Sequence, residues 1–328
     1  MNNMNIAIIG CGLIGKKRAE NIPKGHKLVA ICDTDKNNAN KILQKNKKVK
    51  YFKNWKDIFK ISKLDCIIVS TPHNLLFKIT NYGLKQNKSH LFVEKPGVKN
   101  FKEIKKLINT YKSIKNLRVV IRFGFNHRFL NSIIFANKLI FNKEIRNLLY
   151  MRGVYGHGGK KNYKKEWRGS KKISGGGQLV DQGIHLIDLA RLFFGDLKVY
   201  SFYLDNIYWN TNVEDNVFLT LKNKKKIANL HASWTEWKNK FHLEFFGKEG
   251  KIEINGKGGS YGPEILTLYK MLKNKIKPKK IVYKFKNKDL SWSRELNSFF
   301  LEIKEKKSSI SHLNNLYKNF QIIDNIYN

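Results

Sequence analysis

Short apolar runs alternate with amphipathic stretches over the first 124 residues of the chain. The apolar runs lie within residues 5–9, 27–33, 66–70, 90–96 and 118–123. Between them, apolar residues recur at helical spacing over residues 13–23, 75–86 and 101–111. Such short runs are typical of strands that are buried on both faces of a parallel sheet. The alternation predicts a doubly wound α/β domain over residues 1–124, with its ligand at the carboxyl ends of the strands.

The pattern changes in the second part of the chain. A strongly apolar helical stretch covers residues 178–194. Strand-like runs separated by turn residues lie at 145–154, 197–207, 213–221, 226–235, 240–246 and 250–255, and helical patterns close the chain at 291–306 and 311–327. This order predicts a second α/β domain over residues 125–328, which is rich in strands.

The net charge of +39 raises the possibility of a nucleic-acid-binding protein. The lysines are scattered through every segment beside abundant Asn and Ile, and helix-turn-helix and zinc-finger spacings are missing. We therefore interpret the charge as a bias of composition and predict no nucleic-acid partner. No apolar run is long enough to cross a bilayer, and the first residues are typical of a strand rather than a signal peptide. Because the three cysteines are far apart and no metal-ligand spacing is present, we expect a cytoplasmic protein without a metal site.

A glycine motif lies between the first strand and the first helix. The sequence GCGLIG covers residues 10–15, and Asp33 ends the next strand. In such a motif Gly10 permits the tight turn, Gly12 lets the backbone approach a pyrophosphate, and Gly15 allows close packing of helix on strand. Leu13 and Ile14 begin the helix, whose amino terminus would face the phosphates. This context predicts a dinucleotide site.

Asp33 lies where a carboxylate accepts hydrogen bonds from the ribose hydroxyls of the cofactor, which favours NAD over NADP. The alternative for Asp33 is an exposed turn residue, and Lys36 leaves room for a 2′-phosphate. Further polar residues fall at the same predicted edge of the sheet. Together with the glycine motif and Asp33, the predicted cofactor-binding residues are Ser70, Thr71, Pro72, His73, Glu94 and Lys95.

Five motifs together resemble the glucose–fructose oxidoreductase / inositol dehydrogenase family, also written Gfo/Idh/MocA. They are GCGLIG at 10–15, STP at 70–72, EKP at 94–96, GFNHRF at 124–129 and DQGIHLID at 181–188. The resemblance implies an NAD(P)-dependent oxidoreductase with a Rossmann domain followed by an α/β domain on a large, open, mostly antiparallel sheet. That sheet often mediates assembly in the family, so a homodimer or homotetramer is implied. One position departs from the pattern: Leu76 stands where the family often has a histidine. Two alternatives remain open: His73 takes its place, or the contact is absent.

The resemblance also implies the catalytic residues Lys95, Asp181 and His185. Oxidation of a secondary alcohol removes a hydride and a proton, so a base must lie within hydrogen-bond reach of the hydroxyl. Histidine titrates near neutral pH and suits that role. A carboxylate one helical turn earlier would orient the substrate or the imidazole, and a lysine would stabilise negative charge on the oxygen. The alternative for His185 is a buried histidine that only bonds a carbonyl. We also predict that the Lys95–Pro96 link is cis or otherwise strained.

A basic, aromatic segment precedes the polar helix. We expect it to cover an anionic sugar, with the predicted substrate-binding residues Arg128, Tyr163, Trp167, Arg168 and Asp188. The alternative is a structural role: a solvated basic loop for the segment, and a pairing with Arg191 for Asp188. The favoured substrate is a phosphorylated or nucleotide-linked sugar of surface-polysaccharide biosynthesis. The alternatives are inositol or a free sugar as substrate, and a non-catalytic NAD-binding sensor or a nucleic-acid-binding protein.

Overall fold

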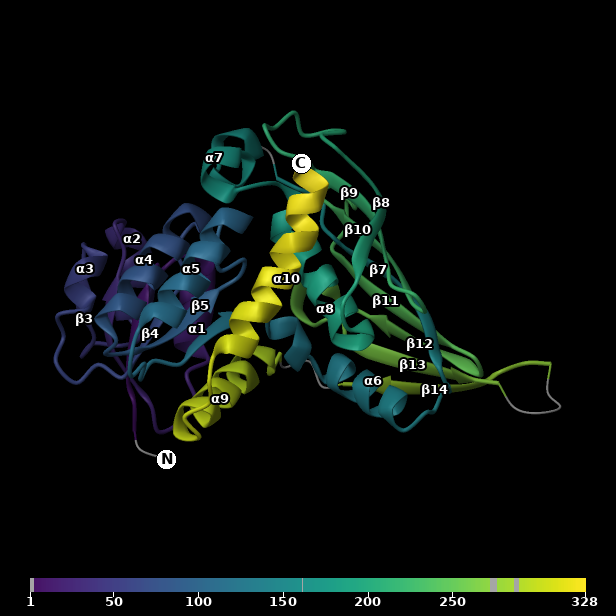
Figure 1. Cartoon of the computed structure of the whole chain (residues 1–328), viewed down its shortest axis with the longest axis horizontal. Coiled ribbons are helices and arrows are strands. Elements are labelled where there is room, and N and C mark those ends of the chain that lie inside the picture. The colour runs from purple at the N-terminus through teal and green to yellow at the C-terminus, as the bar shows by residue number, and fades with distance from the viewer. Residues whose placement is uncertain (1–2, 161, 272–275, 286–288) are drawn as a thin grey trace. The chain divides into compact units, whose positions relative to one another are not determined.

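The computed structural model describes residues 3–160, 162–271, 276–285 and 289–328 of the chain. The chain divides into two compact units (Figure 1). The first comprises residues 1–125 and 292–320, and the second comprises residues 126–291 and 321–328. Each unit is built on one sheet.

The first unit contains a six-stranded parallel sheet in the order β3-β2-β1-β4-β5-β6. Its strands are β1 (Asn5–Ile9), β2 (Lys27–Cys32), β3 (Lys50–Phe52), β4 (Cys66–Val69), β5 (His90–Glu94) and β6 (Ile121–Gly124). Its first five helices are α1 (Leu13–Glu20), α2 (Lys36–Leu43), α3 (Trp55–Ile58), α4 (His73–Gln86) and α5 (Phe101–Ser113). Every residue of β4 and β6 is buried, because helices cover both faces of the sheet. The predicted doubly wound fold is confirmed, and β3 is an additional short edge strand.

Two helices close the chain, α9 (Ser291–Lys304) and α10 (Ile310–Tyr327). The sequence pattern places both in the second domain, whereas the structure groups residues 292–320 with the first unit. The reason is packing: one side of α9 shares a buried core with strands of the six-stranded sheet. That core includes Leu296, Phe299, Phe300 and Ile303 of α9 beside Ile6, Ile8, Ile68 and Phe92.

The second unit contains an eight-stranded sheet in the order β14-β13-β12-β11-β7-β10-β9-β8. The strands are β7 (Leu148–Gly156), β8 (Lys198–Asp205), β9 (Asn216–Lys222), β10 (Ile227–Ser233), β11 (Lys240–Gly247), β12 (Gly250–Asn255), β13 (Ile265–Lys270) and β14 (Lys279–Lys284). All neighbours are antiparallel except β7 and β10, which confirms the large, mostly antiparallel sheet. The strands β13 and β14 had no counterpart in the sequence pattern.

Helices α6 (Asn131–Phe141) and α8 (Ile184–Phe194) lie on one face of the eight-stranded sheet (Figure 1). The predicted helix over 178–194 consists of a π-helical segment, Leu179–Gly183, that continues into α8. A π-helical turn holds one residue more than an α-helical turn and frequently occurs at functional sites.

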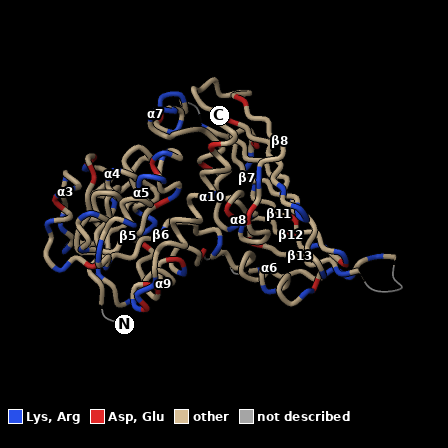
Figure 2. The backbone as a smooth tube through the Cα atoms, viewed as in Figure 1, with Lys and Arg blue, Asp and Glu red and all other residues tan. Residues whose placement is uncertain are grey.

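Lysine and arginine positions are spread over both units (Figure 2). Among the described residues, no helix combines the length and the apolarity that a membrane span requires.

Candidate active site

A tight glycine turn joins β1 to α1 at the carboxyl edge of the six-stranded sheet. Gly10 has a φ of +94°, and a Cβ atom there would lie 2.6 Å from the Ser70 carbonyl carbon. A Cβ atom on Gly15 would lie 1.9 Å from the Gly10 carbonyl oxygen. At Gly12, by contrast, no atom of the described residues lies within 4 Å of that position. The turn is therefore closely packed at two glycines and open at the third, which is the arrangement that a bound pyrophosphate needs.

Helix α1 presents its amino terminus at this turn. Gly12 precedes the helix and has no side chain to cap it, and Leu13, the first helical residue, is 70% exposed. Ile14 is half-buried. The first backbone N–H groups of a helix have no partner within the helix, so this end can donate to an anion. The residues present thus fit the dinucleotide that the motif predicts.

Asp33 follows β2 and lies beside the same turn. Its Oδ2 accepts a hydrogen bond from the Cys11 backbone N–H at 2.6 Å, and its Oδ1 accepts from the Asp35 N–H at 2.8 Å. The side chain is half-buried, and the nearby Lys36 is exposed. These contacts fix the carboxylate against the glycine turn, which suits the predicted ribose contact.

The residues after β4 support the turn from the neighbouring strand. The Ser70 hydroxyl donates to the Gly10 carbonyl oxygen at 2.7 Å, so Ser70 braces the glycine turn. The Thr71 hydroxyl donates to the carbonyl oxygen of Pro72, the residue before α4, at 3.2 Å. These short contacts within the strand ends give Ser70 and Thr71 structural roles, beside any contact with a cofactor.

His73 is the first residue of α4 and is 4% exposed. Leu76 is completely buried in the core of the same unit. An apolar, fully buried side chain has no access to a ligand, so Leu76 does not replace the histidine that the resemblance leads one to expect.

The carboxylate of Glu94 lies in a buried ion pair. Its Oε1 is 2.5 Å from Arg18 Nε, and Arg18 Nη2 is 2.7 Å from Glu295 Oε2. Arg18 is completely buried between the rings of Phe92 and Trp292, at 4.4 and 4.5 Å from their centroids. Arg18 of α1 therefore connects Glu94 of β5 with Glu295 of α9, and Glu94 has a structural role within the first unit.

Lys95 directly follows Glu94 at the end of β5 and is half-buried. The Lys95–Pro96 peptide bond is cis, which confirms the prediction for this link. The backbone of Lys95 thus lies at the same carboxyl edge of the six-stranded sheet as the glycine turn and Asp33.

In the second unit, the π-helical segment carries Asp181 and α8 carries His185. The segment begins at a glycine-rich turn that a buried carboxylate holds in place. Glu214 Oε1 accepts hydrogen bonds from the N–H groups of Gly177 and Leu179, at 2.9 and 3.0 Å, and from the Tyr327 hydroxyl at 2.7 Å. Burial raises the pKa of Glu214 above its ordinary value. Because three donors meet on one oxygen, the start of the polar helix has a fixed position.

His185 is 5% exposed and lies among aromatic rings. The centroid of its ring is 4.0 Å from that of His127 and 6.0 Å from that of Tyr155. His127 belongs to the short 3-10 helix Asn126–Phe129, and Tyr155 belongs to β7. The His127 and Tyr155 rings also lie 5.1 Å apart, so the three rings form one cluster that orients the imidazole.

Asp181, Arg168 and Trp167 lie close together in the structure. Arg168 Nε lies 3.5 Å from Asp181 Oδ2, and the Arg168 guanidinium lies 4.4 Å from the centroid of the Trp167 ring. The Arg168 side chain remains 32% exposed. This pair can present both a carboxylate and a guanidinium to a ligand.

Tyr163, in contrast, belongs to the core of the second unit. It is 8% exposed, and its ring stacks on Trp234 at a centroid distance of 4.4 Å with planes 10° apart. Burial, with the charge of Asp181 as a smaller cause, raises the pKa of its hydroxyl. A stacked, buried ring does not offer its face to a sugar, so the structure corrects the role predicted for this residue.

Arg128 and Asp188 bind each other. Arg128 Nε and Nη2 donate to the two oxygens of Asp188, both at 2.6 Å. Asp188 is 1% exposed, whereas the Arg128 side chain is 29% exposed. Asp188 therefore orients Arg128 and has no surface of its own for a substrate, which differs from the prediction.

Three residues near Asp181 were missed by the sequence reading: Tyr155, Gln182 and Tyr261. Gln182 Nε2 donates to the Tyr261 hydroxyl at 3.2 Å, and the two tyrosine rings lie 5.5 Å apart. Burial raises the pKa of both tyrosine hydroxyls, with Asp181 adding to the effect. Gln182 lies inside the motif DQGIHLID and could have been selected, but no local signal marks the tyrosines.

No group of side chains suited to a metal ion is found among the residues that the structure describes.

Two family models match the chain. Residues 4–122 match the "oxidoreductase family, NAD-binding Rossmann fold", and residues 133–253 match the "GFO/IDH/MocA C-terminal domain". The chain belongs to the Gfo/Idh/MocA oxidoreductase family. The predicted family is therefore confirmed, and so is the NAD-binding character of the first unit.

Curated Gfo/Idh/MocA relatives include two sugar dehydrogenases. Levoglucosan dehydrogenase of Pseudarthrobacter phenanthrenivorans is 29% identical over 146 residues, which is 44% of this chain and 36% of that protein. Glucose-6-phosphate 3-dehydrogenase of Bacillus subtilis is 31% identical over 195 residues, which is 58% of this chain and 53% of that protein. The matched part is thus at most about half of these relatives' length.

Solved structures of the family share the fold over nearly the whole chain. Levoglucosan dehydrogenase in complex with NADH and levoglucosan matches with a TM-score of 0.88 and 20% identity, covering 99% of this chain and 96% of that one. A 3-ketoreductase from Actinomadura kijaniata, in complex with TDP-benzene and NADP, matches with a TM-score of 0.82 and 14% identity, covering 98% and 96%.

Proposed function

We propose that this protein is an NAD-dependent oxidoreductase that transfers a hydride between the nicotinamide and a secondary hydroxyl or ketone of a sugar derivative. The observation that carries the proposal is that one apolar helix bears two polar side chains, each fixed in position by neighbouring side chains. Asp181 pairs with Arg168, and His185, four residues later, packs against the rings of His127 and Tyr155. A helix that served packing alone would have no use for these groups, because burying a polar side chain costs stability.

In the oxidising direction the hydroxyl becomes a ketone, the hydride leaves with its electron pair, and one proton is released. Bound NAD supplies the hydride acceptor. His185 takes the hydroxyl proton at an imidazole nitrogen. Asp181, held by Arg168, orients the substrate or the imidazole. The family resemblance implies Lys95 as the third catalytic residue, because a lysine can donate a hydrogen bond to a substrate oxygen and stabilise its developing negative charge.

The substrate class that we propose is a phosphorylated or nucleotide-linked sugar, used in surface-polysaccharide biosynthesis. The described part of the segment before the polar helix carries many cations: Lys160, Lys164, Lys165, Arg168, Lys171 and Lys172. Positive charge favours an anionic substrate. A relative named for glucose 6-phosphate and a neighbour bound to a TDP derivative support the same class.

A free sugar is the second candidate, and the likeness to levoglucosan dehydrogenase favours it. A single screen separates the two. Glucose 6-phosphate, UDP-glucose, glucose, levoglucosan and inositol are each offered with NAD⁺ and NADP⁺, and the absorbance of the reduced nicotinamide is followed. Reduction with the phosphorylated sugars only would support the first candidate, and reduction with levoglucosan or inositol only would support the second.

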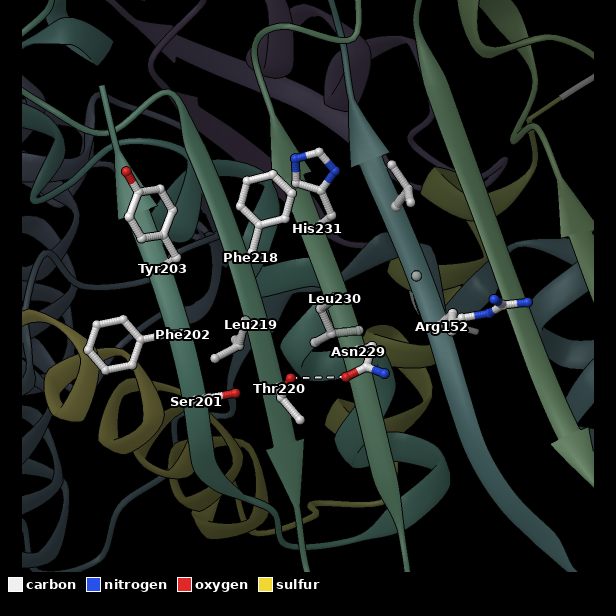
Figure 3. Close-up of a pocket in the computed structure, with 12 residues that line it drawn as sticks. Arg152, Ser201, Phe202, Tyr203, Phe218, Leu219, Thr220, Asn229, Leu230 and His231 are labelled. Atoms are coloured by element: carbon white, nitrogen blue, oxygen red, sulfur yellow. Dashed lines mark hydrogen bonds between the residues drawn. The ribbon is translucent and has the colours of Figure 1, made fainter. Parts of the chain in front are cut away.

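We also propose a homodimer or homotetramer that forms through the open face of the eight-stranded sheet. That face bears a hollow of about 470 Å³ lined by residues of β7, β8, β9 and β10 (Figure 3). Tyr203 is 57% exposed there, Phe202 46% and Phe218 45%. An exposed apolar patch of this kind is typical of a protein interface. Light scattering after gel filtration tests the proposal: Phe218→Glu should lower the mass to that of a monomer, and a wild-type monomer would contradict it.

A cytoplasmic location completes the proposal. The three cysteines are unbonded and buried. Burial raises the pKa of the Cys11 and Cys32 thiols to about 12, which disfavours the nucleophilic thiolate form.

A further inference from the structure

A second hollow of the eight-stranded unit lies at the sheet edge where β7 and β10 end and β11 begins. Its volume is about 470 Å³. The lining residues are Glu236, Lys238, Asn239, Lys240, Phe241, Asn255, Gly256, Tyr261, Gly262, Pro263 and Ile265. Most of them are polar or belong to one glycine-rich turn, and none belongs to the residues predicted from the sequence.

Tyr261 joins this hollow to the polar helix. It lines the hollow, and its hydroxyl accepts the hydrogen bond from Gln182, the residue that follows Asp181. Its ring packs 5.5 Å from Tyr155, whose own ring lies 6.0 Å from that of His185. A ligand in the hollow would therefore touch Tyr261, whose hydroxyl is hydrogen-bonded to the segment that carries Asp181.

The turn that bears Tyr261 connects β12 to β13 and depends on glycine. Gly256, Gly258, Gly259 and Gly262 have φ values of +70°, +84°, +58° and +79°, which other residues rarely adopt. A Cβ atom on Gly256 would also lie 2.2 Å from the Pro263 carbonyl oxygen. The backbone thus folds back tightly and returns the Tyr261 ring to the edge of the sheet.

The turn holds two charged residues, Lys257 and Glu264. Lys257 is half-buried, whereas Glu264 is 5% exposed and accepts hydrogen bonds from Asn131 and Ser132. The Lys257 ammonium lies 4.2 Å from the centroid of the Tyr261 ring and 5.4 Å from that of Tyr155.

Lys257 lies beside the lining through its contact with Tyr261. The lining itself contains two ammonium groups, those of Lys238 and Lys240, and one carboxylate, that of Glu236. The excess of positive charge next to Tyr261 favours an anionic ligand.

We propose that this hollow binds a phosphoryl group carried by the sugar substrate, with Lys238 of the lining and Lys257 beside Tyr261 as its cationic contacts. The inference rests on the proposed function and adds where the charged group of the substrate binds. A phosphoryl group bears up to two negative charges and three acceptor oxygens, so several ammonium groups can bind it at once. Its attachment to the sugar, as a monoester or within a nucleoside diphosphate, is left to the experiment.

Isothermal titration calorimetry at low salt tests the proposal without requiring turnover. Glucose, glucose 6-phosphate and UDP-glucose are titrated in the presence of NADH into the wild type and into Lys238→Gln/Lys257→Gln. The matched control is Lys279→Gln/Lys280→Gln, which removes the same charge from two exposed lysines of β14. We expect at least one phosphorylated sugar to bind the wild type about tenfold more tightly than glucose, the size expected for charge-assisted hydrogen bonds.

The Lys238/Lys257 variant should lose most of that preference, whereas the control variant should keep it. The phosphorylated sugar that shows the effect identifies the attachment. Equal affinity for all three sugars in the wild type, or an undiminished preference in the Lys238/Lys257 variant, would overturn the inference. If binding depends on the two lysines but no sugar reduces NAD⁺, the proposed oxidoreductase function fails and the phosphoryl site stands. If NAD⁺ is reduced but the lysines have no effect, only the site fails.

Discussion

The imidazole rings of His127 and His185 lie 4.0 Å apart between centroids, with an angle of 32° between their planes. Both side chains are buried, at 3% and 5% exposure. His127 belongs to GFNHRF and His185 to DQGIHLID, so two motifs that are 58 positions apart meet at one point of the second unit. Their contact limits the rotation of the His185 ring, which a base must hold toward its substrate.

Substitution at His127 should therefore act through the orientation of His185. We expect His127→Ala to lower turnover about tenfold, because a misplaced base transfers a proton less efficiently. His127→Phe keeps an aromatic ring in place and should retain most of the activity. NADH affinity and melting temperature are measured on both variants. An equal loss in the Phe and Ala variants would contradict a role that depends on ring packing.

Alanine substitutions at Tyr163 and at Trp167 should lower the free energy of unfolding by clearly different amounts. Tyr163 is stacked in the core, so Tyr163→Ala should lower the free energy of unfolding by about 3 kcal/mol, as large aromatic truncations in cores do. Trp167 is only partly buried, and Trp167→Ala should cost less than about 1 kcal/mol. Urea denaturation of both variants provides the comparison. Similar values would show that Tyr163 is not a core residue in solution.

The cofactor preference follows from Asp33. Its carboxylate would accept from ribose hydroxyls and repel a 2′-phosphate, so we expect NADH to bind about tenfold more tightly than NADPH. Calorimetric titration of both cofactors into the wild-type protein measures this. If NADPH binds more tightly, Lys36 or another cation controls the preference.

Glu214 should make the stability depend on pH. Burial raises the pKa of this carboxyl in the folded state, so its favourable contribution is complete below the pKa of the unfolded chain. That contribution is lost as the pH rises through the folded-state pKa. Glu214→Gln keeps an acceptor for Gly177, Leu179 and Tyr327 but cannot ionise.

The stability of Glu214→Gln relative to the wild type should therefore increase from about pH 4 to about pH 7. Urea denaturation at a series of pH values gives the difference. A relative stability that falls over this range would reverse the sign and contradict the account.

The sequence predicted those features that depend on neighbours along the chain. The glycine turn, the strand ends that carry Asp33 and Lys95, and the face shared by Asp181 and His185 follow from spacing within a strand or a helix. The fold class and the family followed from the order of such elements and motifs. In the same way, the cis link before Pro96 belongs to a local motif.

Features that depend on distant partners were missed. The pairs Arg18–Glu94 and Arg128–Asp188 join residues 76 and 60 positions apart, and no local pattern indicates either. Tyr163 lies in a segment whose composition is typical of a binding loop. Its ring nevertheless stacks on the buried ring of Trp234, a residue that is distant in the sequence. Helix α9 has an apolar face like that of any amphipathic helix. Such a face does not indicate which of the two sheets the helix packs against.

The most direct test of the central claim is the turnover of His185→Ala with the best sugar found in the screen, measured together with NADH affinity and melting temperature. We predict that turnover falls about a hundredfold or more, the range expected when a general base is removed, while NADH affinity changes little and the protein stays folded. Lys95→Ala should lower the rate similarly. A folded His185→Ala protein with normal turnover, or a wild-type protein that reduces NAD⁺ with none of the sugars, would contradict the account.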